Sequence, residues 1–600
     1  MQLADIGDLV LTTAAIAALR DAYPRATIDL LASAHALPVV PTGLVDMAIP
    51  LVRGAGSGRS FYAAANLRAV FGLRRRQYDT VVFFHHFTLR AGVFKFWLIA
   101  KCCGAERIVG LRNQNVGFLT DSFDDGGFGA MHQAQYWLEL ASLLGASRAP
   151  RPAQVRREPL DSESVSARNR PRVVLHTGSG GYSKARRWPA ERFAEVAQQL
   201  RKSHDAEIVL VGTLEDGSGI AEELAGANTI DLAGRTSLPQ LADVIAGADL
   251  FVGADSGVMH IAAATGTPVI SIFGPSNADA WKPWAGNARS VVLRSEVECS
   301  PCSYIGHSVG AREGCAARTC MKLVTVEQVL KAARHVLDMQ PSAGTDYHAS
   351  PPTIEQDPRL RILDVPVDAI TYESWLHQID SWIGGGNTRH VCTVNPEFIM
   401  IAQHDPIFFA ILQRAAICVP DGVGLLWASR YLGAPLPERV TGSDGVPYIA
   451  LHAAERGWRL FLLGAAPGVA DRVAAILQER FPGLIVAGAH SGSPAAGEED
   501  RIVDLINESA ADILFVAYGA PEQDKWIARN LPRLQVSMAM GVGGSLDFIA
   551  GVIPRAPQWM QDRGLEWLYR LLRQPWRWRR MLRLPRFVMA VRRQARRRVA

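Results

Sequence analysis

An alternation of strand-like and helical patterns that begins twice along the chain most constrains its fold. In the first half, apolar runs such as 172–177 and 207–212 are separated by amphipathic stretches such as 189–202. This alternation is typical of parallel α/β folds. After a stretch rich in Pro, Ser and Gly at 338–358, the pattern restarts with an apolar run at 390–395. Because 600 residues are too many for one core, we expect two separate α/β units.

Changes in composition give the expected boundaries. A polar and Pro-rich dip near 148–170 divides the first unit, and the stretch at 338–358 separates the two units. The predicted organisation is a first unit at 1–337 with sub-domains at about 1–150 and 171–337, a linker at 338–358, a second unit at 359–560 and a basic extension at 561–600.

The net charge of +5 conceals a strongly basic C-terminal end. Residues 561–600 hold thirteen Arg and two acids, a charge of +11 that leaves −6 for the rest of the chain. Trp576, Trp578, Leu582 and Phe587 make this end too apolar for a purely solvated segment. Arg and Trp together favour an element that lies in an anionic membrane surface. Nucleic acid is not an expected partner, because no basic stripe continues over the acidic body.

The start of the chain shows no secretory leader. Asp5 and Asp8 stand where a signal peptide would be basic, and no run of 18 apolar residues occurs. We therefore expect a cytoplasmic protein with reduced thiols, attached peripherally to the inner face of the cytoplasmic membrane. Homo-oligomerisation is left open.

A Gly- and Ser-rich loop at 176–193 lies between a strand and a helix of the first half. Free backbone N–H groups and a helix N-terminus form an anion site in such a loop. Lys184, Arg186 and Arg187 add charges that suit a diphosphate. A surface turn with a solvated basic run is the alternative.

A second candidate site follows the apolar run that ends near residue 254. Asp255 and Ser256 come directly after this predicted strand, where open α/β sheets bind ligands, and His260 lies one turn into the next helix. Taken alone, His260 is more often a packed histidine than a ligand contact.

These stretches together resemble glycosyltransferase family 9, the ADP-heptose–lipopolysaccharide heptosyltransferases. The resemblance spans about residues 1–337 and rests on 255–276, on 186–189 with Arg in place of the family's usual Lys, and on Gly7-Asp8 with the apolar run after it. The family begins with a full strand before Gly-Asp. Here only six residues precede Gly7, so either the chain is assigned a late start or the first sheet lacks most of its central strand.

The resemblance implies a GT-B architecture of two Rossmann-like sub-domains and an ADP-sugar donor. It also implies that Asp8 is the general base that activates the acceptor hydroxyl. The implied substrate contacts are Lys184, Arg186, Asp255, Ser256 and His260.

Four cysteines near the end of the first unit leave a metal site open. The spacing of Cys299, Cys302, Cys315 and Cys320 is compatible with a zinc ion held by four thiolates. A loop of reduced cysteines is the alternative, and we expect no metal to be required for activity.

Polar residues also follow the predicted strands of the second half. Thr393 and Asn395 lie at the end of one strand, and Asp421 ends the next. A carboxylate at such an edge can act as a general base for a sugar hydroxyl, whereas a helix N-cap is the alternative for this Asp. Arg439 and Thr441 occupy a later loop, and Gln523 follows another strand.

From about 361 to 590 the chain resembles the WecG/TagA/CpsF family, glycosyltransferase family 26. The motifs TVNPEF, PDGVGLLWASRYLG, ERVTGSD, GAPEQDKW and VGGSLDFIAG occur in the family's order. The resemblance implies inverting transfer of a sugar from a UDP donor to a polyprenyl-diphosphate-linked glycan. N-acetylmannosamine, its uronic acid and related hexoses are the implied sugars.

Site residues follow from the same resemblance. Asp421 is the implied base, and Thr393, Asn395 and Gln523 are implied substrate contacts, with Arg439 and Thr441 beside them. The arginines implied to reach over the active site from the extension are Arg570, Arg577 and Arg580.

The sequence thus predicts a GT-B-like pair of Rossmann-like sub-domains, then a separate Rossmann-like glycosyltransferase domain with a helical, Arg- and Trp-rich extension. The functional hypothesis is a bifunctional glycosyltransferase of bacterial envelope polysaccharide synthesis. The alternative is that only the second half is catalytic and the first is degenerate or a scaffold. An NAD-dependent oxidoreductase is disfavoured, because no complete G-x-G-x-x-G with a downstream acid occurs.

Overall fold

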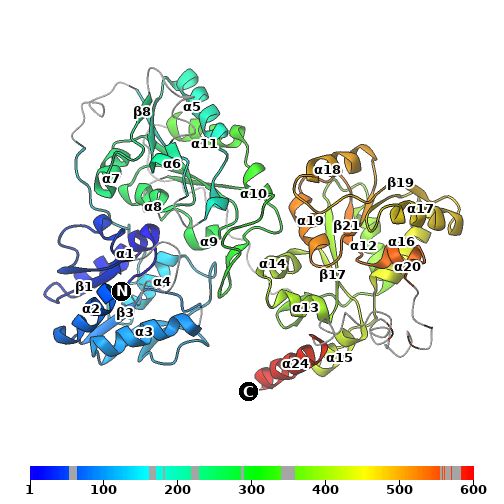
Figure 1. Cartoon of the computed structure of the whole chain (residues 1–600), viewed down its shortest axis with the longest axis horizontal. Helices are drawn as coiled ribbons and strands as arrows, with labels where there is room; N and C mark the ends of the chain where they lie inside the picture. Colours follow the sequence, from blue (N-terminus) through cyan, green and yellow to red (C-terminus); the bar gives the residue numbers. More distant parts are fainter. Residues whose placement is uncertain are drawn as a thin grey trace. The chain divides into compact units, whose positions relative to one another are not determined.

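The chain divides into two compact units (Figure 1). Unit 1 comprises Met1–Ser295 and Pro301–Ala349, and unit 2 comprises Glu296–Ser300 and Ser350–Ala600. The computed structural model describes residues 1–52, 64–88, 90–160, 170–179, 183–217, 229–284, 289–338, 359–553, 557, 560, 569 and 583–599. The predicted linker therefore lies almost wholly outside the described residues. Within them, no helix combines the length and the apolar character needed to span a bilayer.

The second sub-domain of unit 1 is built on a parallel sheet of six strands in the order β8-β7-β6-β9-β10-β11. The strands are β6 (Arg172–His176), β7 (Glu207–Val211), β8 (Thr229–Asp231), β9 (Leu250–Ala254), β10 (Val269–Phe273) and β11 (Ser290–Arg294). β6, β9 and β10 are buried along their whole length, as expected for a sheet with helices on both faces. The chain turns back between β6 and β9, and such a point is where ligands bind in doubly wound folds.

The first sub-domain of unit 1 has two smaller parallel sheets. One pairs β1 (Asp29–Ser33) with β2 (Met47–Leu51), and the other holds β3 (Thr80–Phe83), β4 (Arg107–Arg112) and β5 (Asp121–Asp124). Between them the first residues supply only an isolated bridge, from Gln2 to Ala32, while the Met1 ammonium donates to Val82 O at 2.8 Å.

Helix α1 (Ile6–Ala22) follows directly and is buried on all sides from Leu9 to Leu19. A helix that is apolar all round belongs in a core, and α1 packs against α4 (Gln133–Ser142) of its own sub-domain and α8 (Gly257–Thr265) of the other. This packing fixes the N-terminal turn of α1, which carries Asp8.

Unit 2 contains one parallel sheet of six strands in the order β17-β16-β21-β20-β18-β19. The strands are β16 (Arg389–Val394), β17 (Ile417–Pro420), β18 (Arg459–Gly464), β19 (Ile485–His490), β20 (Ile513–Ala517) and β21 (Met538–Gly541). Alternate residues enter different cores, because successive side chains of a strand point to opposite faces: Phe515 belongs to one cluster, and Leu514 and Val516 to another. The chain reverses its direction of travel between β16 and β21.

Helices flank this sheet and connect its strands (Figure 1). They are α12 (Tyr372–Trp382), α13 (Pro396–Ala402), α14 (Pro406–Arg414), α15 (Val423–Tyr431), α16 (Gly442–Arg456), α17 (Val469–Arg480), α18 (Glu499–Glu508), α19 (Glu522–Asn530) and α20 (Ser545–Ile549). A short hairpin of β14 (Leu360–Ile362) and β15 (Val365–Val367), which the sequence patterns did not predict, precedes them.

The described part of the basic extension is one helix, α24 (Arg583–Val599), which confirms the expected helical character for this segment. Phe587 and Val591, one turn apart, are buried, and Arg583 pairs with Glu397 of α13 at 2.7 Å. Phe587 therefore packs inside unit 2 and does not belong to the exposed face of this helix. Arg586, Arg592, Arg593 and Arg596 are exposed. Arg570, Arg577 and Arg580 lie outside the described residues.

Candidate active sites

Asp421 lies at the carboxyl end of β17, beside the end of β16. Its backbone N–H donates to Val394 O at 2.7 Å and so continues the pairing of the two strands. The N-cap of α15 is Gly422, with φ of 110°, so the N-cap interpretation of Asp421 is not the one the structure adopts. A Cβ on Gly424 would lie 2.6 Å from the Pro396 ring, so this glycine lets α15 pack closely against α13.

Asn395 and Thr393 occupy the neighbouring strand end. The Asn395 side chain caps α13 by accepting the Phe398 N–H at 3.0 Å, and Pro396 takes the first helical position. Thr393 is buried, and its hydroxyl donates to Gly541 O of β21 at 3.1 Å. Both residues therefore have structural partners at the edge where the chain reverses direction.

Gln523 reaches the same edge from the first turn of α19. It is 1% exposed, and its Oε1 accepts the Gly543 N–H at 2.8 Å. A Cβ on Gly541 would lie 2.4 Å from Gln523 Nε2, so only glycine leaves room for this side chain over the end of β21. We call Thr393, Asn395, Asp421 and Gln523 the C-terminal site.

The loop before α16 lies next to this site. Val440 N–H donates to Pro420 O at 3.0 Å, which brings Arg439 to the end of β17. Thr441 caps α16: its Oγ1 accepts the Asp444 N–H at 3.1 Å and donates to the Asp444 carboxylate at 2.8 Å. The sequence did not single out Tyr372, whose Oη accepts the Thr441 N–H at 2.9 Å. Burial raises the pKa of Tyr372.

In unit 1, Asp8 lies in the first turn of α1. Burial, followed by the charge of Asp5, raises the pKa of the Asp8 carboxyl to about 6. Trp281, from the other sub-domain, donates its indole N–H to Asp8 Oδ1 at a long 3.5 Å. The carboxylate is thus ionised at neutral pH and sits where the two sub-domains meet.

Asp255, Ser256 and His260 lie after β9, as predicted. Asp255 forms a buried ion pair with Arg186 at 2.9 Å, and Ser256 caps α8. His260 packs against α1, where a Cβ on Gly7 would lie 2.6 Å from its ring. Burial lowers the pKa of His260 to about 4, so the ring is neutral. We call Asp8, Arg186, Asp255, Ser256 and His260 the N-terminal site.

A cavity of about 370 Å³ opens beside the end of β6. Its lining includes Thr177, Arg187, Trp188, Asp216, Arg318 and Lys322. Arg187 pairs with Asp216 at 3.0 Å, whereas the exposed Lys184 pairs with Glu215 at 2.9 Å. Arg187, Arg318 and Lys322 are therefore the cations that line this space, and Lys184 is not among its lining residues.

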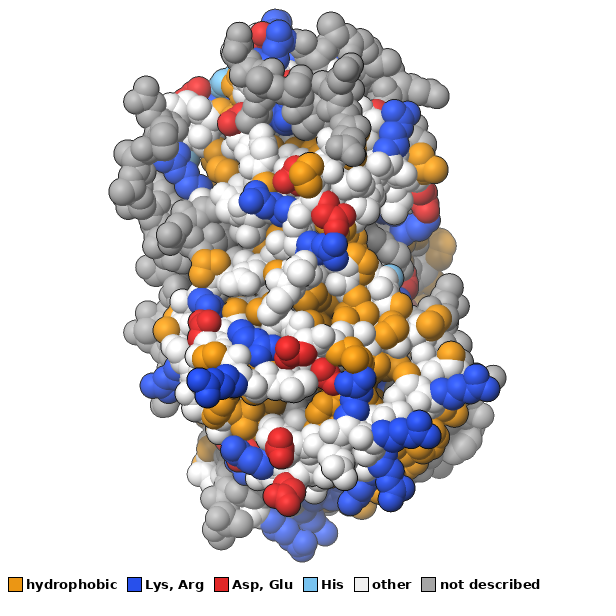
Figure 2. All heavy atoms as spheres, turned by 90° about the vertical axis from the view of Figure 1, so that its left-hand side faces the viewer, with side chains coloured by type: hydrophobic (Ala, Val, Ile, Leu, Met, Phe, Trp, Pro, Cys, Tyr) orange, Lys and Arg blue, Asp and Glu red, His pale blue; other side chains and the backbone are white. Residues whose placement is uncertain are grey.

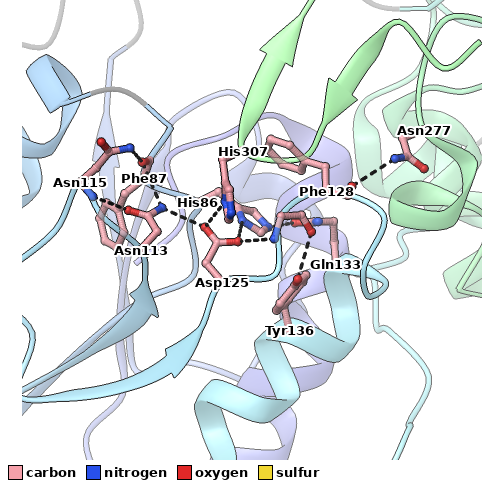
Figure 3. Close-up of polar contacts among 11 residues, drawn as sticks. His86, Phe87, Asn113, Asn115, Asp125, Phe128, Gln133, Tyr136, Asn277 and His307 are labelled. Carbon is pink, nitrogen blue, oxygen red and sulfur yellow. Dashed lines mark hydrogen bonds and ion pairs between the residues drawn. The ribbon is translucent and has the colours of Figure 1, made fainter. Parts of the chain in front are cut away.

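A polar network that the sequence did not reveal lies at the carboxyl ends of β3, β4 and β5 (Figure 3). His86 Nδ1 contacts Asp125 at 2.9 Å and its Nε2 contacts Gln133 at 3.0 Å. Asn113 also donates to Asp125, and His307 of the other sub-domain lies 3.6 Å from it. Burial alone raises the pKa of Asp125, but these hydrogen bonds, that of His86 foremost, bring it down to about 2.

Metal-ligating side chains gather at a place that the sequence did not indicate. Among the described residues, His390, Cys392 and Asp524 of unit 2 bring ligand atoms within 4.8 Å of one another. Cys299, Cys302, Cys315 and Cys320, all described, do not form such a group. The structure therefore gives no support to a zinc ion held by these four thiols.

Parallel sheets bind ligands at the carboxyl ends of their strands, and both units carry carboxylates and cations there. Comparisons with known proteins indicate the class of enzyme. Residues 71–311 match the model of glycosyltransferase family 9 (heptosyltransferase), and residues 360–600 match that of the glycosyl transferase WecG/TagA/CpsF family. The chain belongs to the WecG/TagA/CpsF family and is a glycosyltransferase. The two resemblances predicted from the motifs are confirmed.

Three relatives share the name N-acetylglucosaminyldiphosphoundecaprenol N-acetyl-β-D-mannosaminyltransferase. That of Bacillus spizizenii is 35% identical over 215 residues, which are 36% of this chain and 83% of the relative. That of Bacillus subtilis is 34% identical, over 36% of this chain and 82% of the relative. That of Staphylococcus aureus strain MW2 is 30% identical, over 38% of this chain and 88% of the relative.

Solved structures similar to the chain include two from heptosyltransferase families. ADP-heptose lipopolysaccharide heptosyltransferase II of Escherichia coli is 23% identical, with a TM-score of 0.41, over 56% of this chain and 97% of that one. A family 9 glycosyl transferase of Veillonella parvula is 21% identical, with a TM-score of 0.44, over 56% of this chain and 95% of that one.

Proposed function

We propose that unit 2 transfers N-acetylmannosamine, or a closely related sugar, from a UDP donor to N-acetylglucosamine linked to a polyprenyl diphosphate. The observation that carries this proposal is the position of Asp421. Its carboxylate follows β17 at the edge shared with Thr393, Asn395 and Gln523, in a chain 35% identical to an enzyme of that name. In this proposal, the transfer is a step in the synthesis of an envelope polysaccharide.

In the proposed reaction, Asp421 takes the proton of the acceptor hydroxyl. The hydroxyl oxygen then forms a bond to the anomeric carbon on the face opposite the UDP. The bond from that carbon to the diphosphate oxygen breaks, and UDP leaves with the electron pair, so the configuration inverts. One base suffices because no covalent enzyme intermediate is formed.

Each other residue of the C-terminal site has a proposed role. Thr393, Asn395 and Gln523 hold the sugars at the sheet edge, and Arg439, at the end of β17, faces the negative charge that develops on the diphosphate. Arg570, Arg577 and Arg580 of the extension are proposed to complete the diphosphate site. Thr441 acts chiefly through the helix that it caps.

For unit 1 we propose a second nucleotide-sugar transfer, from an ADP-sugar. Asp8 is the base in this proposal, and the cavity beside β6, lined by Arg187, Arg318 and Lys322, takes the nucleotide diphosphate. The alternative is that unit 1 is a scaffold and only unit 2 is catalytic.

The test uses the full chain and labelled nucleotide sugars with a short-chain polyprenyl-diphosphate N-acetylglucosamine acceptor. We expect transfer from UDP-N-acetylmannosamine to the acceptor, lost in Asp421→Asn and kept in Asp8→Asn. A wild-type chain that transfers no sugar from any UDP-N-acetylhexosamine contradicts the proposal for unit 2. If the wild-type chain transfers no sugar from any ADP-sugar, the scaffold alternative for unit 1 holds.

Peripheral attachment to an anionic membrane is part of the proposal, because the proposed acceptor is a lipid. Besides the exposed arginines of α24, unit 1 exposes Phe94 (54%) and Trp97 (39%) on α3 (Arg90–Cys103), with their rings stacked 5.5 Å apart. Phe71 of the adjacent α2 (Ala64–Gly72) is 57% exposed. Figure 2 shows hydrophobic side chains next to Lys and Arg on the face of unit 1. Aromatic rings beside cations suit the headgroup layer.

Flotation with vesicles tests this attachment. Replacing Phe94 and Trp97 by Ser is expected to lower binding to phosphatidylglycerol vesicles several-fold. Leu214→Ser, which removes an apolar side chain of unit 1 that is more exposed (72%) than either ring, serves as the control. Binding that is the same for both variants, or the same for neutral and anionic vesicles, contradicts the proposed surface.

A further inference from the structure

Three potential metal ligands lie in the core of unit 2, away from the residues that follow the strands. His390 and Cys392 are two apart on β16 and therefore point to the same face of the sheet. Asp524, from the first turn of α19, meets them there. All three are fully buried, and their ligand atoms lie within 4.8 Å of one another.

The distances within this cluster are compatible with a shared ion. His390 Nε2 lies 3.5 Å from Asp524 Oδ1 and 3.5 Å from Cys392 Sγ. The nitrogen–oxygen separation is at the long limit for a hydrogen bond, whereas the nitrogen–sulfur separation is ordinary for a weak hydrogen bond to a thiol. Zinc bonds of about 2.0–2.3 Å in a tetrahedron place neighbouring ligand atoms about 3.4–3.6 Å apart. The observed separations match the edges of that tetrahedron.

Asp524 has one partner in this core, an ion pair between its Oδ1 and His390 Nε2 at 3.5 Å. Its carboxylate is fully buried, and neither oxygen has a hydrogen bond within the described part of the chain. Buried carboxylates are normally hydrogen-bonded, paired or bound to a metal, because an unsatisfied charge in a core is costly. A cation between Asp524 and Cys392 would satisfy both oxygen and sulfur.

The surroundings supply an outer partner for the histidine. Cys418 lies opposite Cys392 in the β16–β17 register, but its thiol donates to Leu412 O at 3.5 Å and does not belong to the group of three ligand atoms. His390 Nδ1 lies 2.7 Å from Glu298, whose segment Glu296–Ser300 groups with unit 2. A carboxylate on the far nitrogen of a ligating histidine is the usual outer partner in zinc sites, where it orients the ring.

We propose that His390, Cys392 and Asp524 bind one zinc ion that joins β16 to α19. Sulfur and imidazole ligands favour zinc over magnesium or calcium. The ion ties together the two elements that carry Thr393 and Gln523, so its role is to hold the C-terminal site in shape. No step of sugar transfer passes through it. This inference goes beyond the proposed function and does not depend on it.

Metal analysis of the full chain, purified without a metal-affinity tag, tests the proposal. We expect one zinc per chain in the wild type, and loss of most of it in Cys392→Ala and in Asp524→Asn. Cys302→Ala is the matched control, because it removes a buried thiol of unit 1 and should leave the zinc in place. Circular dichroism of each variant shows whether it has folded.

A second measurement needs no variant. Exchange of the bound metal for Co²⁺ is expected to give the thiolate-to-cobalt charge-transfer band and the strong visible bands of a tetrahedral site. A wild-type chain that retains no metal after incubation with equimolar zinc and desalting overturns the proposal. So does zinc that is lost with Cys302→Ala but kept with Cys392→Ala.

Discussion

The two candidate sites are assembled in different ways. The C-terminal site lies on one sheet edge: Thr393 and Asp421 follow adjacent strands, and Gln523 follows a third strand of the same sheet. The N-terminal site joins two sub-domains, because Asp8 belongs to the first and Asp255 to the second. The pairing of strands within one sheet therefore positions the C-terminal site, whereas the N-terminal site depends on contacts between two sub-domains.

Specific contacts join the two sub-domains around this site, in addition to the packing of α1 on α8. The Trp281 indole reaches Asp8, and His260 fits against Gly7. Phe128 N–H donates to Gly306 O at 2.7 Å, beside the network around Asp125 (Figure 3). The comparison teaches that small changes far from the chemistry should disturb unit 1 more than unit 2.

The largest expected effect separates the two activities. Asp421→Asn should reduce transfer to the polyprenyl acceptor about 10²- to 10⁴-fold, because it removes a general base without changing the shape of the side chain. Asp8→Asn should leave that transfer unchanged and abolish any ADP-sugar transfer. Initial rates with each donor measure both effects. A loss of both activities in either variant would show that the two sites are not independent.

Gly7→Ala tests the dependence of the N-terminal site on packing between sub-domains. The new Cβ would lie 2.6 Å from the His260 ring, so α1 or α8 must shift, and a displacement of about 1 Å costs about 100-fold in rate. Gly117→Ala is the matched control, since nothing lies within 4 Å of its Cβ. Rates of ADP-sugar transfer compare the two variants. Equal rates for both would remove the proposed importance of this contact.

Asp125→Asn should weaken unit 1 without affecting unit 2. The Asp125 pKa of about 2 lies below its ordinary 3.8, so the ionised form contributes about 2 kcal/mol at pH 7. This stability is present above pH 3.8 and is lost as the pH falls through 2. Denaturant titrations at pH 7 and pH 3 measure it. A variant as stable as the wild type at pH 7 would mean that the network contributes no net stability.

The smallest effect concerns the pH dependence of unit 1. With a pKa of about 6, Asp8 is half ionised near pH 6, so ADP-sugar transfer should fall to half there and decline further in acid. A raised carboxyl pKa stabilises the fold below pH 3.8 and ceases to do so as the pH rises through 6. Asp8→Asn is therefore expected to stabilise unit 1 above pH 6. Rate profiles and thermal melts between pH 5 and pH 8 check both expectations.

Sequence patterns located the central strands well. The runs at 172–177, 207–212 and 390–395 correspond to β6, β7 and β16, since buried parallel strands are nearly continuous apolar runs. The residues that follow these strands, Asp421 among them, could be predicted because parallel strands present their carboxyl ends at one edge.

Clusters of side chains from distant parts of the chain have no signature in the local sequence. The network of His86, Asp125 and His307 joins residues up to 221 positions apart, so no spacing rule reveals it. The cluster of His390, Cys392 and Asp524 likewise depends on how α19 packs on β16. The sequence could not tell Asp421 from a helix N-cap; the backbone places Gly422 at the cap, and the role of Asp421 as a base stays a prediction.

Helix α24 links the far end of the chain to the neighbourhood of the C-terminal site. Arg583 is bound to Glu397, two residues beyond Asn395, while Gln594 bonds to the backbone of Arg361 and Leu363. The other face of α24 carries exposed arginines. The arginine-bearing end of the chain is therefore coupled to α13 both by the Arg583–Glu397 ion pair and by the packing of Phe587 and Val591, so a charge bound at that face acts close to the helix that Asn395 caps.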